Sequence, residues 1–203
     1  LLVELARLEA AHPDLDDPAS PTRRVGGDPI DGFTQREHRL PMLSIDNTYS
    51  EGDLADWHAR MVRSLGADAL FGTPLAFVAE PKVDGVALSI RYEQGRLLHA
   101  VTRGDGQKGD DVTHAARTIR ALPMLLSRGA PEILEVRGEV FIPASEFERI
   151  NAEREADGEE LLANPRNACA GTIKNLEPKV AAGRKLGFVA HGRGEISDDD
   201  FAD

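Results

Sequence analysis

Hydrophobic and polar positions alternate along the middle of the chain with the period of a β-strand. In VALSIRYE (86–93), apolar residues stand at every second position, which predicts a strand with one buried face. Similar segments stand before it at 75–80 and after a Gln-Gly turn at 96–102, and two more lie at 132–142 and 185–192. Short turns between such segments predict a largely antiparallel sheet.

Four other segments repeat their apolar residues every three or four positions, which is the period of an amphipathic helix. In the segment 51–66 the apolar stripe includes Trp57, which we expect in the core. Further stripes lie at 112–119 and 144–158. The segment NPRNACAGTIKNL (164–176) opens with an asparagine cap and a first-turn proline. Helices on the faces of an antiparallel sheet indicate an α+β fold.

The two ends of the chain differ from this middle. Residues 1–12 begin directly in helical periodicity without a cap, so we expect the tail of a helix and a chain that is a fragment. Five prolines and three glycines between positions 13 and 41 predict an extended connector. Residues 194–203 carry five acids and no base.

Composition narrows the class of protein. The 203 residues are 41% hydrophobic and 29% charged, which is typical of a globular protein. The net charge of −11 argues against a protein that coats nucleic acid by bulk attraction. Cys169 is the single cysteine, so it predicts neither an internal disulfide nor a Cys-rich zinc site, and we expect a small buried residue. No apolar run approaches the roughly 18 residues of a membrane helix.

A candidate nucleophile lies in the segment EPKVDG (80–85). Lys82 is either a solvated edge charge or an amine that attacks phosphorus, which it does only when deprotonated. Bringing a lysine pKa from ~10.4 to near 7 takes roughly 4 kcal/mol, from burial and nearby cations. In an extended strand Glu80, Lys82 and Asp84 point to one face, and Gly85 lets a ligand approach the backbone. The tetrapeptide Lys-x-Asp-Gly is too short to decide between the two roles.

Other charged residues supply what a nucleotide pocket needs. Arg103 ends a predicted strand and can hold phosphate or ribose oxygens, while Glu139 shares a strand face with Arg137 and can accept hydrogen bonds from a ribose. Arg166 and Lys174 are eight residues apart, so both project from one side of a helix. Composition leaves open whether their basic segment binds anions or is a solvated helix face.

Four longer segments together carry a family resemblance: PMLSIDNTYS (41–50), EPKVDGVALSIRYEQGRLLHAVTRGDGQKGDDVT (80–113), LEVRGEVFIP (134–143) and NPRNACAGTIKNL (164–176). In order and spacing, over about residues 1–192, they resemble the bacterial NAD-dependent DNA ligases in their nucleotidyltransferase, or adenylation, domain. The patterns NPRN-x-x-AG and LS-x-DN favour this NAD branch over ATP-dependent ligases and RNA-capping enzymes, which share Lys-x-Asp-Gly.

The resemblance implies an ATP-grasp-like adenylation fold and a catalytic sequence. Lys82 attacks the α-phosphate of NAD, releases nicotinamide mononucleotide and carries AMP, with Asp84 needed for the chemical steps. AMP then passes to the 5′-phosphate of nicked double-stranded DNA, and the 3′-hydroxyl displaces it to seal the strand in replication and repair. Mg²⁺ or Mn²⁺ is implied, and zinc only in a C-terminal region that this chain lacks.

The resemblance also assigns binding roles. The implied cofactor-binding residues are Ser44, Ile45, Glu80, Gly85, Arg103, Glu139 and His191, and the implied DNA or phosphate contacts are Arg166 and Lys174. Lys174 stands where the family usually has arginine, so it lacks the bidentate fork. His191 stands where a tyrosine usually stacks on adenine, and it offers less stacking area.

Domain boundaries follow from the same resemblance. Residues 1–12 match the tail of an N-terminal nicotinamide-binding domain, 13–41 a connector, 42–192 an adenylation domain without its C-terminal part, and 193–203 an acidic tail. We expect a cytoplasmic bacterial monomer that does not bind membranes. Because both ends look incomplete, the alternative is an inactive remnant that binds nucleotide or nicked DNA.

Overall fold

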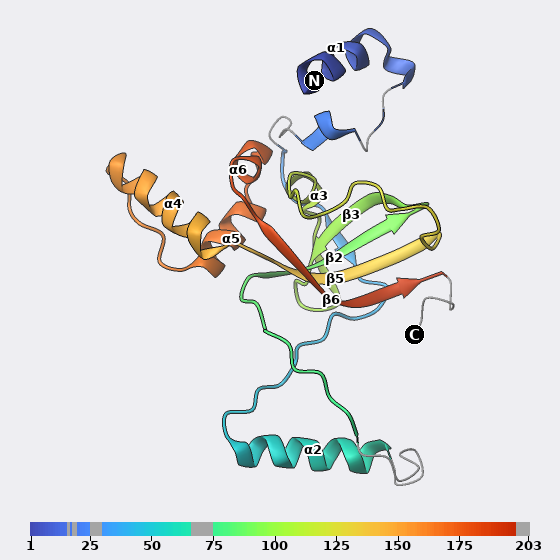
Figure 1. The fold of residues 1–203 in the computed structure, drawn as a ribbon, viewed down its shortest axis with the longest axis vertical. Coiled ribbons are helices and arrows are strands. Elements are labelled where there is room, and N and C mark those ends of the chain that lie inside the picture. Colours follow the sequence, from blue (N-terminus) through green and yellow to red (C-terminus); the bar gives the residue numbers. More distant parts are fainter. Residues whose placement is uncertain (16, 18–19, 25–29, 66–74, 198–203) are drawn as a thin grey trace. The chain divides into compact units, whose positions relative to one another are not determined.

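The computed structural model describes residues 1–15, 17, 20–24, 30–65 and 75–197. The chain divides into two compact units. The first combines Leu1–Met42 with Val83–Asp203, and the second is Leu43–Lys82. The sheet belongs to the first unit and helix α2 (Glu51–Leu65) to the second (Figure 1).

The first unit is organised by a four-stranded antiparallel sheet in the order β3-β2-β5-β6 (Figure 1). Its strands are β2 (Val86–Glu93), β3 (Arg96–Thr102), β5 (Ile133–Phe141) and β6 (Gly187–Ile196). A two-stranded ladder pairs β1 (Gln35–Glu37) with β4 (Lys108–Asp110). The α+β class with antiparallel sheets is confirmed, and the alternating sequence segments predict all four strands of the main sheet.

The first unit also contains helices. They are α1 (Leu2–Ala11), α3 (Thr113–Ala116), α4 (Ala144–Ala156), α5 (Pro165–Ile173) and α6 (Pro178–Ala182), with 3-10 turns at Pro13–Leu15 and Pro21–Arg24. The predicted start of α5 is confirmed, because the Asn164 side chain accepts the Asn167 N–H at 2.8 Å and Pro165 is the first helical residue.

One face of the sheet carries the hydrophobic core. Leu88, Ile90 and Val140 have no exposed surface, and they pack with apolar residues of α3, α5 and α6. Cys169 of α5 lies in this core and donates from Sγ to the Val140 carbonyl at 3.3 Å. Burial raises the pKa of this thiol to about 12, so Cys169 is the buried small residue that the sequence predicts.

The opposite face of the same strands is polar and is nevertheless largely buried. Ser89 and Arg91 alternate with the core residues of β2, and Glu135 and Glu139 stand on β5. Each of these four residues is at most 9% exposed. The two central strands, β2 and β5, are therefore buried on both faces, with apolar side chains on one and hydrogen-bonded polar and charged side chains on the other.

The strand predicted at 75–80 is wrong, because the described residues 75–85 contain none. Pro81 lacks the N–H that a ladder needs. Phe77 and Val78 are exposed instead of packed into a sheet. Alternation alone does not supply a partner strand, and this segment has none among the described residues.

The helix predicted at 51–66 is confirmed as α2, although its apolar stripe is not a core. No residue of α2 is buried, and Leu54 and Leu65 are about half exposed. Trp57, expected in the core, is partly exposed and packs against Phe77 with ring centroids 5.1 Å apart. The second unit is too small to bury this stripe within itself.

Candidate active site

Arg103 and Glu139, two of the predicted nucleotide contacts, lie where the ends of three strands come together. This side of the sheet, formed by strand ends, is called the sheet edge. Because the strands are antiparallel, β2 begins at the edge where β3 and β5 end. Ala87 at the start of β2 pairs with Glu139 of β5, and its carbonyl accepts the backbone N–H of Arg103 at 3.0 Å. The sheet therefore brings the backbones of Arg103 and Glu139 to either side of one residue.

Gly85 is held against β5 just before this edge. Its N–H donates to Oε1 of Glu139 at 3.1 Å. A Cβ added to Gly85 would lie 2.0 Å from the Val140 carbonyl oxygen, a distance that no side chain tolerates. The close packing of the chain on β5 therefore requires a glycine here, and the approach of a ligand that the sequence suggests stays a prediction.

An ion-paired cluster forms around the same carboxylate. Arg166, in the first turn of α5, donates from Nη1 to Oδ1 of Asp84 at 2.6 Å. The same nitrogen lies 3.9 Å from Oε1 of Glu139. The hydrogen bond to Asp84 raises the pKa of Arg166, so the guanidinium stays charged. Arg166 and Asp84 are both substantially exposed, so an anion that reaches this edge meets a cation already in place.

Lys174 and His191 lie on two elements next to this cluster, at the C-terminal end of α5 and on β6. Lys174 is the residue that ends α5, and its Nζ lies 2.8 Å from Oδ2 of Asp110 in β4. His191 is exposed on β6, at the irregularity between Ala190 and Gly192, which pair with successive residues of β5. It is therefore on the strand next to Glu139.

The remaining predicted site residues belong to the second unit. Ser44, Ile45, Glu80 and Lys82 all lie between Leu43 and Lys82, and all four side chains are exposed. The EPKVDG segment is thus divided: Glu80 and Lys82 end the second unit, whereas Asp84 and Gly85 belong to the first. Residues 80–84 form no strand, so the single face predicted for the three charged residues is not a strand face.

Sequence reasoning missed a charge network on the polar face. Oε1 of Glu135 accepts from Ser89 Oγ at 2.7 Å and from Arg137 Nε at 3.0 Å. Burial alone would raise the pKa of Glu135, but these two hydrogen bonds prevail and hold it below its ordinary value. Arg91 pairs with Glu93 and Glu195 on the same face. The sequence signal that could have indicated this network is the set of polar residues that alternate with apolar ones in β2 and β5.

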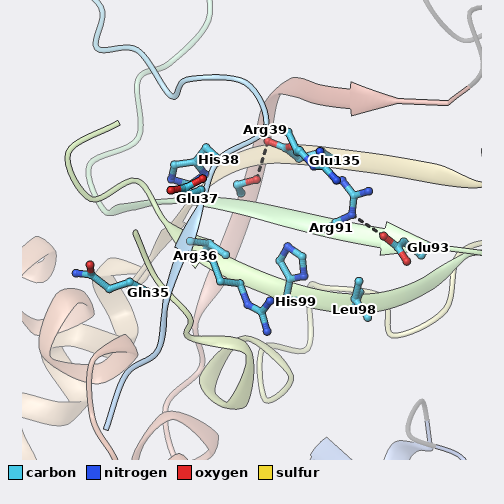
Figure 2. Close-up of a pocket in the computed structure, with 12 residues that line it drawn as sticks. Gln35, Arg36, Glu37, His38, Arg39, Arg91, Glu93, Leu98, His99 and Glu135 are labelled. Atoms are coloured by element: carbon cyan, nitrogen blue, oxygen red, sulfur yellow. Dashed lines mark hydrogen bonds and ion pairs between the residues drawn. The ribbon is translucent and has the colours of Figure 1, made fainter. Parts of the chain in front are cut away.

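A cavity of about 560 Å³ lies on this polar face, and Figure 2 shows the residues that line it. It lies between residues 35–39 and the strands β2, β3 and β5. His99 lines it, and burial together with Arg36 lowers the pKa of this imidazole. The predicted site residues do not line this cavity, so it is separate from the Asp84–Arg166–Glu139 cluster.

With this geometry established, comparison with known proteins identifies the family. Residues 30–202 match the NAD-dependent DNA ligase adenylation domain. The chain belongs to this family. It is 50% identical over its whole length to the "DNA ligase" of Akkermansia muciniphila. It is 52% identical over 95% of its length to "DNA ligase 1" of Opitutus terrae, and 53% identical over 92% to the "DNA ligase" of Parabacteroides distasonis.

The adenylation-domain chain spans 26–28% of the length of these three relatives. Among its described residues, no helix is both long and apolar enough to cross a membrane. The family match covers both the sheet and the segment that contains Lys82. The matched residues therefore include both the cluster at the sheet edge and the exposed lysine.

Proposed function

We propose that this chain carries the lysyl-adenylation chemistry of an NAD-dependent DNA ligase, with Lys82 as the nucleophile. The observation that supports it most is the cluster that follows the lysine in the chain. Asp84 is ion-paired with Arg166, and Gly85 is bound by Glu139. Asp84, two residues after Lys82, thus lies beside the cation of Arg166, which is also close to the carboxylate of Glu139. All of these residues fall within the segment that matches the adenylation domain.

In the proposed step, the free amine of Lys82 attacks the α-phosphorus of NAD. A P–N bond forms, the P–O bond to nicotinamide mononucleotide breaks, and the leaving group takes the electron pair while Nζ loses a proton. Burial and nearby cations favour the free amine. Lys82 is exposed in this chain, so we expect the complex with NAD to bury it.

We assign nucleotide binding to the residues that the family resemblance names. Glu80 contacts adenine, Ser44 and Ile45 line the NAD site, and His191 stacks on the base. Arg103 and Glu139 serve the sugar and phosphates, for which their convergence on Ala87 is the support.

The second half of the proposed reaction takes place on nicked double-stranded DNA. AMP passes from Lys82 to the 5′-phosphate, and the 3′-hydroxyl displaces it. Arg166 and Lys174 contact the phosphates from the two ends of α5. Lys174 is paired with Asp110, so a DNA phosphate must compete with that carboxylate. We expect a monomer that acts in the bacterial cytoplasm in replication and repair.

The site offers a divalent cation two carboxylates, those of Asp84 and Glu139. Among the described residues, no group of three or more His, Cys, Asp or Glu side chains is arranged to hold a metal. Mg²⁺ needs no such cage, because it is commonly held by one or two carboxylates together with substrate phosphates. Asp84 and Glu139 are the carboxylates that would hold Mg²⁺ or Mn²⁺, which when bound neutralises phosphate charge.

The test is the intact mass of the chain after incubation with NAD and Mg²⁺, beside Lys82→Ala. We expect a gain of one AMP that is absent in the variant. A gain that survives in Lys82→Ala would show that another residue is the nucleophile. No gain in the wild-type chain would instead favour the remnant that binds nucleotide or nicked DNA without turnover.

A further inference from the structure

Residues 35–42, called the strap here, cross the first unit just before the chain enters the second. The strap begins with β1, which pairs with β4. Its His38 N–H donates to the Gln107 carbonyl at 2.8 Å, and its Met42 N–H donates to the Gly106 carbonyl at 2.9 Å. His38 Nε2 lies 3.1 Å from the Thr102 carbonyl oxygen. The strap is therefore fixed to the β3–β4 loop up to its last residue.

Arg137 holds the end of the strap from the side of the sheet. Its Nη2 donates to the Leu40 carbonyl at 2.5 Å, and its Nη1 donates to the Pro41 carbonyl at 2.9 Å. Pro41 has no N–H, so this part of the strap cannot form an ordinary ladder. A planar guanidinium is suited to two adjacent acceptors, which a lysine ammonium cannot bind with the same geometry.

The third nitrogen of Arg137 is anchored inside the sheet. Nε donates to Glu135, which also accepts from Ser89. A Cβ on Gly194 would lie 2.2 Å from the Glu135 carboxyl carbon, so the glycine leaves room for this side chain. In Figure 2 the strap residues His38 and Arg39 pass over the strands that carry Arg91 and Glu135. The guanidinium is thus oriented by a buried carboxylate toward the strap.

The chain returns to the first unit at Val83, and a neighbouring side chain holds it there. Glu139 accepts the Gly85 N–H. Glu139 and Arg137 are two residues apart on β5, so they point to the same face roughly 7 Å apart. Side chains on one face of β5 therefore bind the chain at Leu40 and Pro41, just before it leaves the first unit, and at Gly85, just after it returns.

We propose that Arg137 is a positioning residue for the adenylation of Lys82. This inference rests on the function proposed above. Arg137 binds the chain just before it leaves the first unit, and Glu139 binds it just after its return. The segment between these points carries Ser44, Ile45 and Lys82, so both of its ends are restrained before NAD binds. Such restraint lowers the entropy that is lost when reacting groups are brought together.

The test compares Arg137→Met with Arg91→Met. Arg91 is an equally shielded arginine on the same face, but its hydrogen bonds run to Glu93 and Glu195 instead of the strap. For Arg137→Met we expect the single-turnover adenylation rate at saturating NAD to fall roughly tenfold to a hundredfold. The half-saturating NAD concentration should change less. Arg91→Met should keep a rate within about threefold of wild type, and equal losses in the two variants would overturn the proposal.

Amide hydrogen exchange separates positioning from loss of fold. In Arg137→Met, protection should fall roughly fivefold or more at the Met42 and His38 amides, since each loses about 1 kcal/mol or more of local stability. Protection at the Ile90 amide in β2 should not change. A uniform loss across β2 would show a merely structural role and overturn the proposal. A wild-type chain that does not adenylate would refute the proposed function, whereas unchanged strap protection in the variant refutes the anchor by itself.

Discussion

The two faces of the central strands β2 and β5 are both buried, yet they are built differently. On one face Leu88, Ile90 and Val140 pack against helices. On the other face Ser89, Glu135 and Arg137 are joined by directed hydrogen bonds. Apolar packing is non-directional and tolerates many arrangements of similar volume. Hydrogen bonds between buried charges are satisfied by one arrangement only.

The apolar face therefore stabilises the fold, whereas the polar face determines where particular side chains point. The apolar face supplies the burial that stabilises the fold, at roughly 25 cal/mol per Å² of apolar surface. Buried ion pairs contribute little net stability, because desolvation offsets their attraction. The polar face instead orients Arg137 toward the strap and Glu139 toward Gly85. Substitutions on the two faces should therefore have different consequences.

The largest effect on stability is expected from Ile90→Ala on the apolar face. Ile90 has no exposed surface, so the substitution removes buried methyl and methylene groups and leaves a cavity. We expect a loss of about 2–5 kcal/mol in the free energy of unfolding, measured by urea titration. The loss should be similar at pH 7 and pH 4, because no titrating group is removed. A loss below about 1 kcal/mol would mean that the helices do not pack on this face.

A smaller, pH-dependent effect is expected from Glu135→Gln on the polar face. Gln keeps the shape but loses the charge that Ser89 and Arg137 bind, which should cost about 1–3 kcal/mol at pH 7. Hydrogen bonding holds the pKa of Glu135 below its ordinary value, so the folded state binds fewer protons than the unfolded state. Its contribution is complete above the ordinary carboxyl pKa and is lost as the pH falls through the folded pKa.

The wild-type and Glu135→Gln free energies of unfolding should therefore begin to converge below pH ~4.3, where the unfolded carboxyl takes up its proton, and should meet only below the lower pKa of the folded carboxyl. Urea titrations at pH 7 and pH 3 measure this. Ile90→Ala is the control, since its difference from wild type should stay nearly constant over the same range. A Glu135→Gln difference that is equal at both pH values would show that the network makes no use of the charge.

The same contrast explains how much of the fold could be predicted from the sequence. Alternation in 86–93 and 132–142 correctly indicates β2 and β5, because one face of each strand is apolar. It also indicates a strand at 75–80, where the structure has none. A strand needs a partner as well as a pattern, and the exposed Phe77 and Val78 have none among the described residues. Local sequence does not encode that partner.

The candidate site was predictable in its residue types and less so in its arrangement. Asp84, Gly85, Glu139 and Arg166 can be named from the family resemblance, and the structure brings these four together. The role of Arg137 could not be read from the sequence. Its partners are carbonyls of Leu40 and Pro41, nearly one hundred residues away, and any residue type offers a carbonyl.

The smallest effect on stability, with a large effect on chemistry, is expected from Arg166→Ala. Arg166 and Asp84 form an ion pair at the edge of the polar face, with side chains that are 50% and 73% exposed. Exposed pairs contribute about 0–1 kcal/mol, so the urea midpoint should hardly move. Adenylation should fall by roughly a hundredfold, because an arginine beside a transferring phosphoryl group stabilises its charge. Arg149→Ala, which removes an arginine on α4 that is ion-paired with Glu146 and Glu153 and with no residue of the cluster, is the comparison. It lowers stability, since the buried Glu146 loses its partner, and should leave adenylation unchanged. If Arg166→Ala instead lowers stability as Arg149→Ala does and preserves adenylation, the edge of the polar face is a structural extension of the network and not part of the reacting site.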